Sequence, residues 1–146
     1  MKDPLSVGLG ALGSGAGTGG ATIVAALILV RTLERHFPGI NYEESAQDPV
    51  LVGTFAGLAV GAAFGWRKSG ALDNIAQRGV IGLLSAVGAL LIAFIAWPVH
   101  RLLGIPGLIG LGLASFALGV AASRWAAQGS RPDAVDTHES ERIPRA

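Results

Sequence analysis

Two histidines, His36 and His100, are the side chains in this chain best suited to holding a cofactor. Each follows an apolar stretch and neighbours an arginine, Arg35 or Arg101. Neutral imidazole ligates haem iron and other metals, so the pair could bind a haem, a chlorophyll or a metal ion. The alternative is two histidines beside helix ends, with the polar ring tips at the membrane interface. We favour the interfacial interpretation and expect no cofactor, because no motif for a buried ligand pocket accompanies either residue.

Acidic residues form the second group with metal-binding chemistry. Glu43, Glu44 and Asp48 lie between two apolar stretches, and carboxylate oxygens are ligands for hard divalent cations. A solvated acidic loop explains the same residues, and we expect no metal site. The chain contains no cysteine, which excludes disulfides, thiolate metal sites and cysteine nucleophiles. No zinc spacing, phosphate loop or nucleophile elbow occurs either, so we expect a protein that is not an enzyme.

Three hydroxyl side chains, Ser14, Thr18 and Thr22, follow one another four residues apart within an uncharged stretch. Residues at this spacing share one face of a helix. In a ring of helices such a face could line a pore for small or neutral solutes. The alternative is that the hydroxyls bond back to their own helix or across to a neighbouring one.

The composition predicts that membrane-spanning helices position these residues. Hydrophobic residues make up 51% of the 146 residues, charged residues 14%, and the mean hydropathy is +0.53. A soluble domain carries roughly a quarter charged residues, so these values indicate a membrane protein of one domain. The net charge of +1 gives no reason to expect a nucleic-acid partner.

Four uncharged stretches predict an all-α integral membrane protein, because about 20 apolar residues suffice for one transmembrane helix. The expected spans are at about residues 5–30, 49–66, 79–99 and 104–123. They form a four-helix transmembrane domain of residues 1–125, followed by a polar tail, 126–146, that we expect to be disordered.

The first span leaves two alternatives open. Residues 7–20 contain seven glycines, so this half is either a closely packed helix or partly unwound where other helices shield it. A signal peptide cleaved near Ala21 or Ala26 is the competing interpretation. The apolar region of a signal peptide is typically rich in leucine rather than glycine, which favours a retained helix.

Glycines in the second span are spaced for close helix packing. Gly53, Gly57, Gly61 and Gly65 recur every four residues, which gives a helix one face without side chains, a glycine zipper. In lipid such a face lets a second backbone approach closely. Similar small-residue spacing extends the set of expected helix-packing residues to Gly13, Gly17, Ser115, Gly119 and Ser123.

Residues 13–19, Gly-Ser-Gly-Ala-Gly-Thr-Gly, resemble the alternating-glycine first helix of the rotary ATPase ring proteolipids. The resemblance covers about a dozen residues. Those subunits carry a membrane-embedded carboxylate on the following helix, whereas the matching residues 50–65 contain none. The resemblance therefore implies a closely packed first helix and not a proton-carrying function.

The distribution of basic residues predicts the orientation. Eight of the eleven Lys and Arg residues fall on the side of the N-terminus if the chain crosses four times, and basic loops stay in the cytoplasm. Trp66, Trp97 and Trp125 mark the ends of three expected spans, where an amphipathic ring prefers the interface. We expect a multi-pass protein of the bacterial inner (plasma) membrane with both termini cytoplasmic.

The functional expectation is a small non-catalytic accessory or scaffolding subunit. It would pack through its glycine zipper against itself or against the other subunits of a larger membrane complex, because eleven glycines in residues 7–20 and 53–65 exceed what one small bundle needs. The alternative function is a homo-oligomeric channel or holin-like pore lined by Ser14, Thr18 and Thr22.

Overall fold

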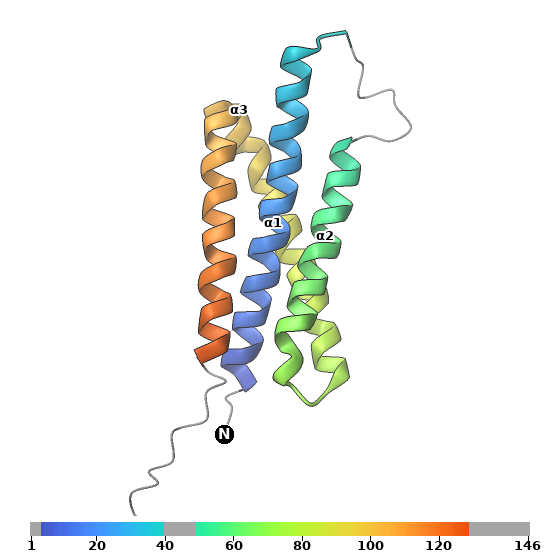
Figure 1. The fold of residues 1–146 in the computed structure, drawn as a ribbon, viewed down its shortest axis with the longest axis vertical. Coiled ribbons are helices and arrows are strands. Elements are labelled where there is room, and N and C mark those ends of the chain that lie inside the picture. Colours follow the sequence, from blue (N-terminus) through green and yellow to red (C-terminus); the bar gives the residue numbers. More distant parts are fainter. Residues whose placement is uncertain (1–3, 40–48, 129–146) are drawn as a thin grey trace, which may run out of the picture.

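A computed structural model describes residues 4–39 and 49–128 of the chain. The regular elements within these residues are all helical: α1 (Pro4–His36), α2 (Pro49–Lys68), the short 3₁₀ helix η1 (Ser69–Ala71) and α3 (Ile75–Gln128). They run along one common axis as a bundle (Figure 1). The predicted all-α class is confirmed for the described residues.

Three helical segments are long and apolar enough to cross a membrane. They are Pro4–His36, Pro49–Ala71 and Ile75–Gln128. Large apolar side chains point outward from all three, among them Leu5, Phe55 and Phe94. An apolar exterior around helices whose backbone groups bond internally fits a helical membrane protein.

The polypeptide changes direction within α3. Gly104 has φ 64° and ψ −152°, which are not helical angles, and this region of backbone space is open almost only to glycine. The first arm of α3, residues 75–103, passes behind α1, and the second arm, residues 105–128, returns in the opposite direction (Figure 1). The spans expected at 79–99 and 104–123 both fall within α3. The reversal lies in the sequence Gly-Ile-Pro-Gly at residues 104–107, whose glycines and proline predict a tight turn between the two spans.

α1 is the central helix of the bundle. It lies between α2 and the second arm of α3 (Figure 1) and contacts both α2 and α3. Twelve of its residues are buried, whereas α2 buries only Gly57, Gly61 and Gly65. Residues 7–20 are helical throughout, because neighbouring helices cover the glycines that would destabilise this helix in water.

Several boundaries differ from the expected ones. α3 begins at Ile75, and residues 72–74 separate it from the end of η1. The Asn74 side chain accepts the Ala76 N–H at 2.9 Å, as a helix N-cap does. At its other end α3 continues to Gln128, three residues into the expected tail. The rest of that tail, 129–146, and the acidic residues Glu43, Glu44 and Asp48 lie outside the described residues.

Candidate functional site

The backbones of α1 and α2 touch where both carry glycine. A Cβ atom added at Gly19 would lie 2.6 Å from the carbonyl oxygen of Gly57, and one added at Gly15 would lie 2.5 Å from that of Gly61. Real Cβ atoms do not approach oxygen so closely, so neither α1 position accepts a larger residue without movement. The glycine face of α2 is therefore covered within the same chain, by α1 at Gly57 and Gly61 and by the first arm of α3 at Gly65. Gly53 lies farther along this contact, against Ala26.

α1 meets the second arm of α3 through a second small-residue contact. A Cβ atom at Gly17 would lie 2.5 Å from the Gly119 nitrogen and 2.6 Å from the Ser115 carbonyl oxygen. Gly13 faces Ala122 in the same contact. The structure thus brings together most of the expected packing residues of the first and last spans. Ser123 is half-buried on this arm.

Ser85 occupies the junction of α1, α2 and the first arm of α3. It is 0% exposed, and its hydroxyl donates to the Ile81 carbonyl oxygen at 2.8 Å. A Cβ atom at Gly15 would lie 2.6 Å from the Ser85 Cβ, and Gly65 faces the same side chain. Ser85, Ala89 and Ala93 repeat the four-residue spacing of small residues in the third expected span, a spacing that predicts close helix packing.

The expected pore-lining stripe is buried at its first position and half-buried at its second. Ser14 is 2% exposed, and Thr18 lies against Gly119 of α3. The Thr18 hydroxyl donates to the Ser14 carbonyl oxygen at 2.7 Å, and the Thr22 hydroxyl donates to that of Thr18 at 2.9 Å. These hydroxyls bond back to their own helix, which was the alternative interpretation. The pore itself stays a prediction.

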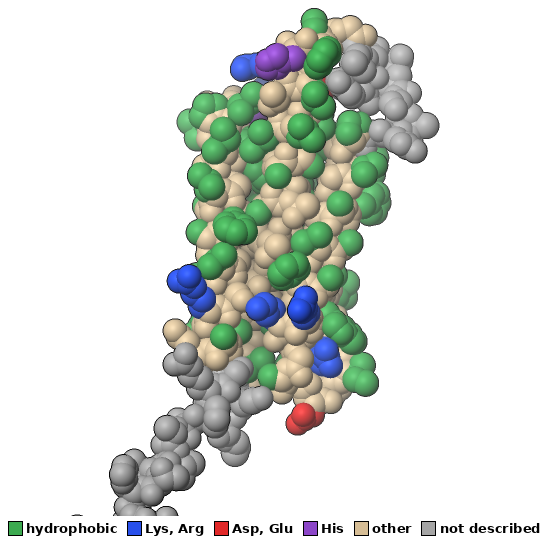
Figure 2. Space-filling view, in the orientation of Figure 1, with side chains coloured by type: hydrophobic (Ala, Val, Ile, Leu, Met, Phe, Trp, Pro, Cys, Tyr) green, Lys and Arg blue, Asp and Glu red, His purple; other side chains and the backbone are tan. Residues whose placement is uncertain are grey.

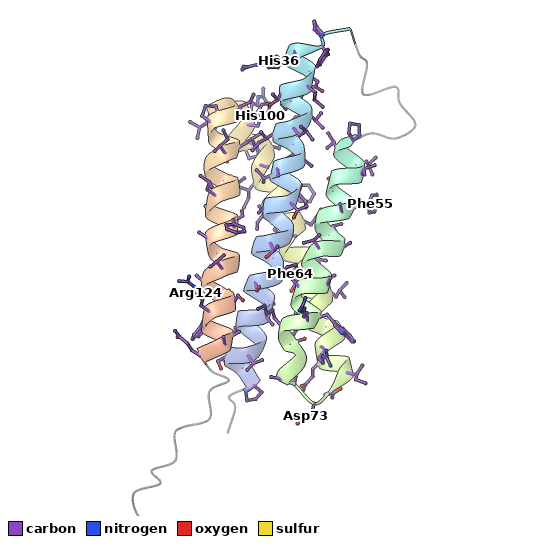
Figure 3. The ribbon with its side chains drawn as sticks, in the orientation of Figure 1. His36, Phe55, Phe64, Asp73, His100 and Arg124 are labelled. Atoms are coloured by element: carbon purple, nitrogen blue, oxygen red, sulfur yellow. The ribbon has the colours of Figure 1, made fainter. Side chains whose placement is uncertain are left out.

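His36 and His100 lie at the same end of the bundle, opposite to Asp73 (Figure 3). His36 is exposed, and its Nδ1 is 2.9 Å from the Thr32 carbonyl oxygen. His100 is half-buried, and its Nδ1 is buried with no hydrogen-bond partner among the described residues. The described residues contain no group of three His, Cys, Asp or Glu side chains that could hold a metal ion.

Two hollows adjoin His100. The first, which we call the inner hollow, has a volume of about 210 Å³ and is lined by α1, α2 and both arms of α3. The second, the outer hollow, has a volume of about 300 Å³ and lies between the end of α1 and the turn at Gly104. Arg31 and His100 line both hollows. No local pattern in the sequence indicates either hollow, because each hollow is formed by residues far apart in the chain.

The opposite end of the bundle carries most of the described basic side chains. Arg67 and Lys68 end α2, Arg78 begins α3, and Arg124 lies near its end. On the face shown in Figure 2, Lys and Arg side chains gather toward this end and apolar side chains cover most of the length above them. The Arg78 guanidinium lies 5.0 Å from the centre of the Trp66 ring, a cation–π contact that holds both side chains at this end.

The second arm of α3 has a face of small residues that no described helix covers. Gly110, Ala114, Ala117 and Ala121 are all exposed and lie four, three and four residues apart, so they share one side of the helix. A Cβ atom at Gly110 would meet nothing within 4 Å. Larger side chains flank this small-residue face and form a shallow groove beside Ala117 and Ala121, and they include Phe116, Val120 and Trp125.

Comparison of the chain with models of protein families, with curated proteins and with solved structures finds no match.

Proposed function

We propose that this chain is a non-catalytic membrane subunit that crosses the bilayer four times and has both termini in the cytoplasm. The two arms of α3 would each form one span. α3 has 54 residues, more than twice the roughly 20 that one crossing needs, and its reversal at Gly104 allows both arms to cross. The basic end of the bundle would face the cytoplasm, in agreement with the positive-inside rule.

The subunit would pack against another transmembrane helix through the small-residue face of the second arm. The single observation that supports this assignment is that Gly110, Ala114, Ala117 and Ala121 are exposed on the side opposite to buried Ser115 and Gly119. In lipid, hydrophobicity alone does not drive helices together, and small residues permit the close backbone approach that does.

This surface differs from the one that the sequence suggested. The glycine face of α2 is occupied by α1, with Gly57 and Gly61 against Gly19 and Gly15. The argument that glycines are left over for a partner therefore does not apply to α2. The proposed partner contact moves to the second arm of α3, where small residues remain uncovered by the described helices.

The test is native mass spectrometry of the full chain extracted from its membrane in a mild detergent. We expect the wild type to run as a complex of fixed stoichiometry, either with copies of itself or with other membrane proteins. Ala117→Leu combined with Ala121→Leu should release the chain from this complex, because two large side chains fill the groove and prevent close helix approach. The matched control is Ala59→Leu with Ala63→Leu, since both residues are exposed on α2. A wild-type monomer, or equal effects of both pairs, would contradict the proposal.

A further inference from the structure

The inner and outer hollows together have the shape of a site for an amphipathic molecule. The inner hollow is bounded by apolar side chains, chiefly Ile23, Leu27, Ala93, Trp97 and Leu108. The outer hollow is bounded by polar and charged side chains of the α1 end together with the turn at Gly104. Because Arg31 and His100 line both, one molecule with an apolar and a polar part can occupy the two at once.

The apolar part of this site has room for part of an alkyl chain. Its volume of about 210 Å³ exceeds the roughly 150 Å³ of an engineered aliphatic cavity that stays free of water and binds benzene. In a bilayer the apolar material next to such a hollow is lipid acyl chain. Trp97, on the wall of this hollow and 67% exposed, is of the residue type that collects at the membrane interface, which places the hollow's polar end near the headgroups.

The polar part of the site carries net positive charge. Two arginines, Arg31 and Arg35, and one carboxylate, that of Glu34, line the outer hollow. The Glu34 Oε2 lies 2.8 Å from Arg31 Nη1. A guanidinium has five N–H donors, so this ion pair leaves Arg31 with donors to spare. An anionic group in the outer hollow would complement the charge and could accept these hydrogen bonds.

We propose that this site binds one anionic phospholipid. One acyl chain fills the inner hollow, and the headgroup phosphate lies in the outer hollow against Arg31 and Arg35. A zwitterionic lipid lacks the net charge that the two arginines select, and free phosphate leaves the inner hollow unfilled. The site is independent of the helix partner proposed above, because it lies between the helices of one chain.

The experiment uses purified full-length chain in mild detergent with equal amounts of phosphatidylglycerol and phosphatidylcholine, and native mass spectrometry counts the retained lipids. We expect one phosphatidylglycerol per chain. Each basic residue near an anionic headgroup contributes about a fivefold preference, so Arg31→Gln should lower the selectivity by about that factor. Arg67→Gln, at the opposite end, is its matched control. Equal retention of both lipids by the wild type would overturn the proposal.

Filling the inner hollow tests the position of the acyl chain. Ala93→Phe should abolish retention of either lipid, whereas Ala63→Phe, on the exposed side of α2, should leave retention unchanged. Undiminished lipid retention by Ala93→Phe would overturn the assignment of the acyl chain to the inner hollow. Inorganic phosphate should not displace the lipid at equal concentration, and displacement would identify a simple phosphate site instead.

A fluorescence measurement keeps the proposal testable if Ala93→Phe does not fold. With Trp66→Phe and Trp125→Phe in place, Trp97 is the only remaining tryptophan. Phosphatidylglycerol with brominated acyl chains should quench it with saturation at one lipid per chain. Quenching that rises without saturation, as for lipid at the general surface, would contradict a defined site.

Discussion

At the scale of single residues, the bundle depends on glycines that differ widely in their surroundings. A Cβ atom at Gly17 would collide with the backbone of Gly119 and Ser115. One at Gly8 would meet only the end of the Ile81 side chain, at 3.6 Å. Backbone cannot move away as a flexible side chain can. The same substitution should therefore have opposite consequences at these two positions of α1.

Gly17→Ala should destabilise the chain by about 1–3 kcal/mol, the usual cost of overpacking. Gly8→Ala should be neutral or stabilise the chain, because alanine has the higher helix propensity in water and the added methyl group meets no backbone. Unfolding in detergent, followed by circular dichroism, measures both. Equal stability of the two variants would contradict the contact between α1 and the second arm of α3.

Ser85 separates the effect of volume from that of hydrogen bonding. Ser85→Ala should cost less than about 1 kcal/mol. The hydroxyl bonds to its own helix at Ile81 (2.8 Å) and more weakly to the Leu12 carbonyl oxygen of α1 (3.4 Å), and an interhelical hydrogen bond in a membrane contributes about 0.6 kcal/mol on average. Ser85→Leu should cost more, about 1–3 kcal/mol, because Gly15 and Gly65 leave no space for it. The same unfolding assay measures the stability of both variants. A larger loss of stability for Ser85→Ala than for Ser85→Leu would overturn this ranking.

At the scale of elements, α3 depends on one residue for its reversal. Gly104 is the one described residue with positive φ, and its angles are open almost only to glycine. The neighbouring Pro106 lies in the first turn of the second arm, where a proline does not interrupt a helical hydrogen bond. The turn therefore depends on the chemistry of Gly104 more than on that of Pro106.

Gly104→Ala should destabilise the chain by about 1–3 kcal/mol through backbone strain. Gly79→Ala is the matched control within α3, because a Cβ atom there would meet the Trp66 ring at an ordinary 3.6 Å. Unfolding of both variants in detergent gives the comparison. If Gly104→Ala were as stable as Gly79→Ala, the reversal would not require a left-handed residue.

At the scale of the whole molecule, the proposed four crossings place each end of the bundle on one side of the membrane. The end with Phe37 and Leu102 would be outside, and the end with Asp73 and Gln128 would be cytoplasmic. All four side chains are exposed, and the chain has no native cysteine. Single cysteines at these positions therefore report sidedness without background.

A membrane-impermeant thiol reagent applied to intact cells should label Phe37→Cys and Leu102→Cys. Asp73→Cys and Gln128→Cys should react only after the membrane is opened, which serves as the accessibility control for each variant. Labelling of Leu102→Cys and Gln128→Cys from the same side would contradict two crossings by α3. If Asp73→Cys and Gln128→Cys were labelled in intact cells and the other two were not, the four crossings would stand and the orientation would be wrong.

The sequence by itself determined the all-helical class, the apolar segments and the turn at Gly104. These depend on local properties: the length of uncharged stretches, the spacing of small residues and the backbone freedom of glycine. Spacing also identified Gly17, Gly57 and Gly119 as positions for close contact. Periodicity assigns a residue to a face of its helix, but it does not say which helix covers that face.

Only the tertiary structure decided the partners of those faces. It placed α1 at the centre, so that the glycines of α1 and α2 meet each other, and no described helix covers Ala117 and Ala121. It also brought Arg31 beside His100 at the mouth of an apolar hollow, although the two are far apart in the chain. Such contacts arise from the packing of whole helices, and no local pattern of residues encodes them.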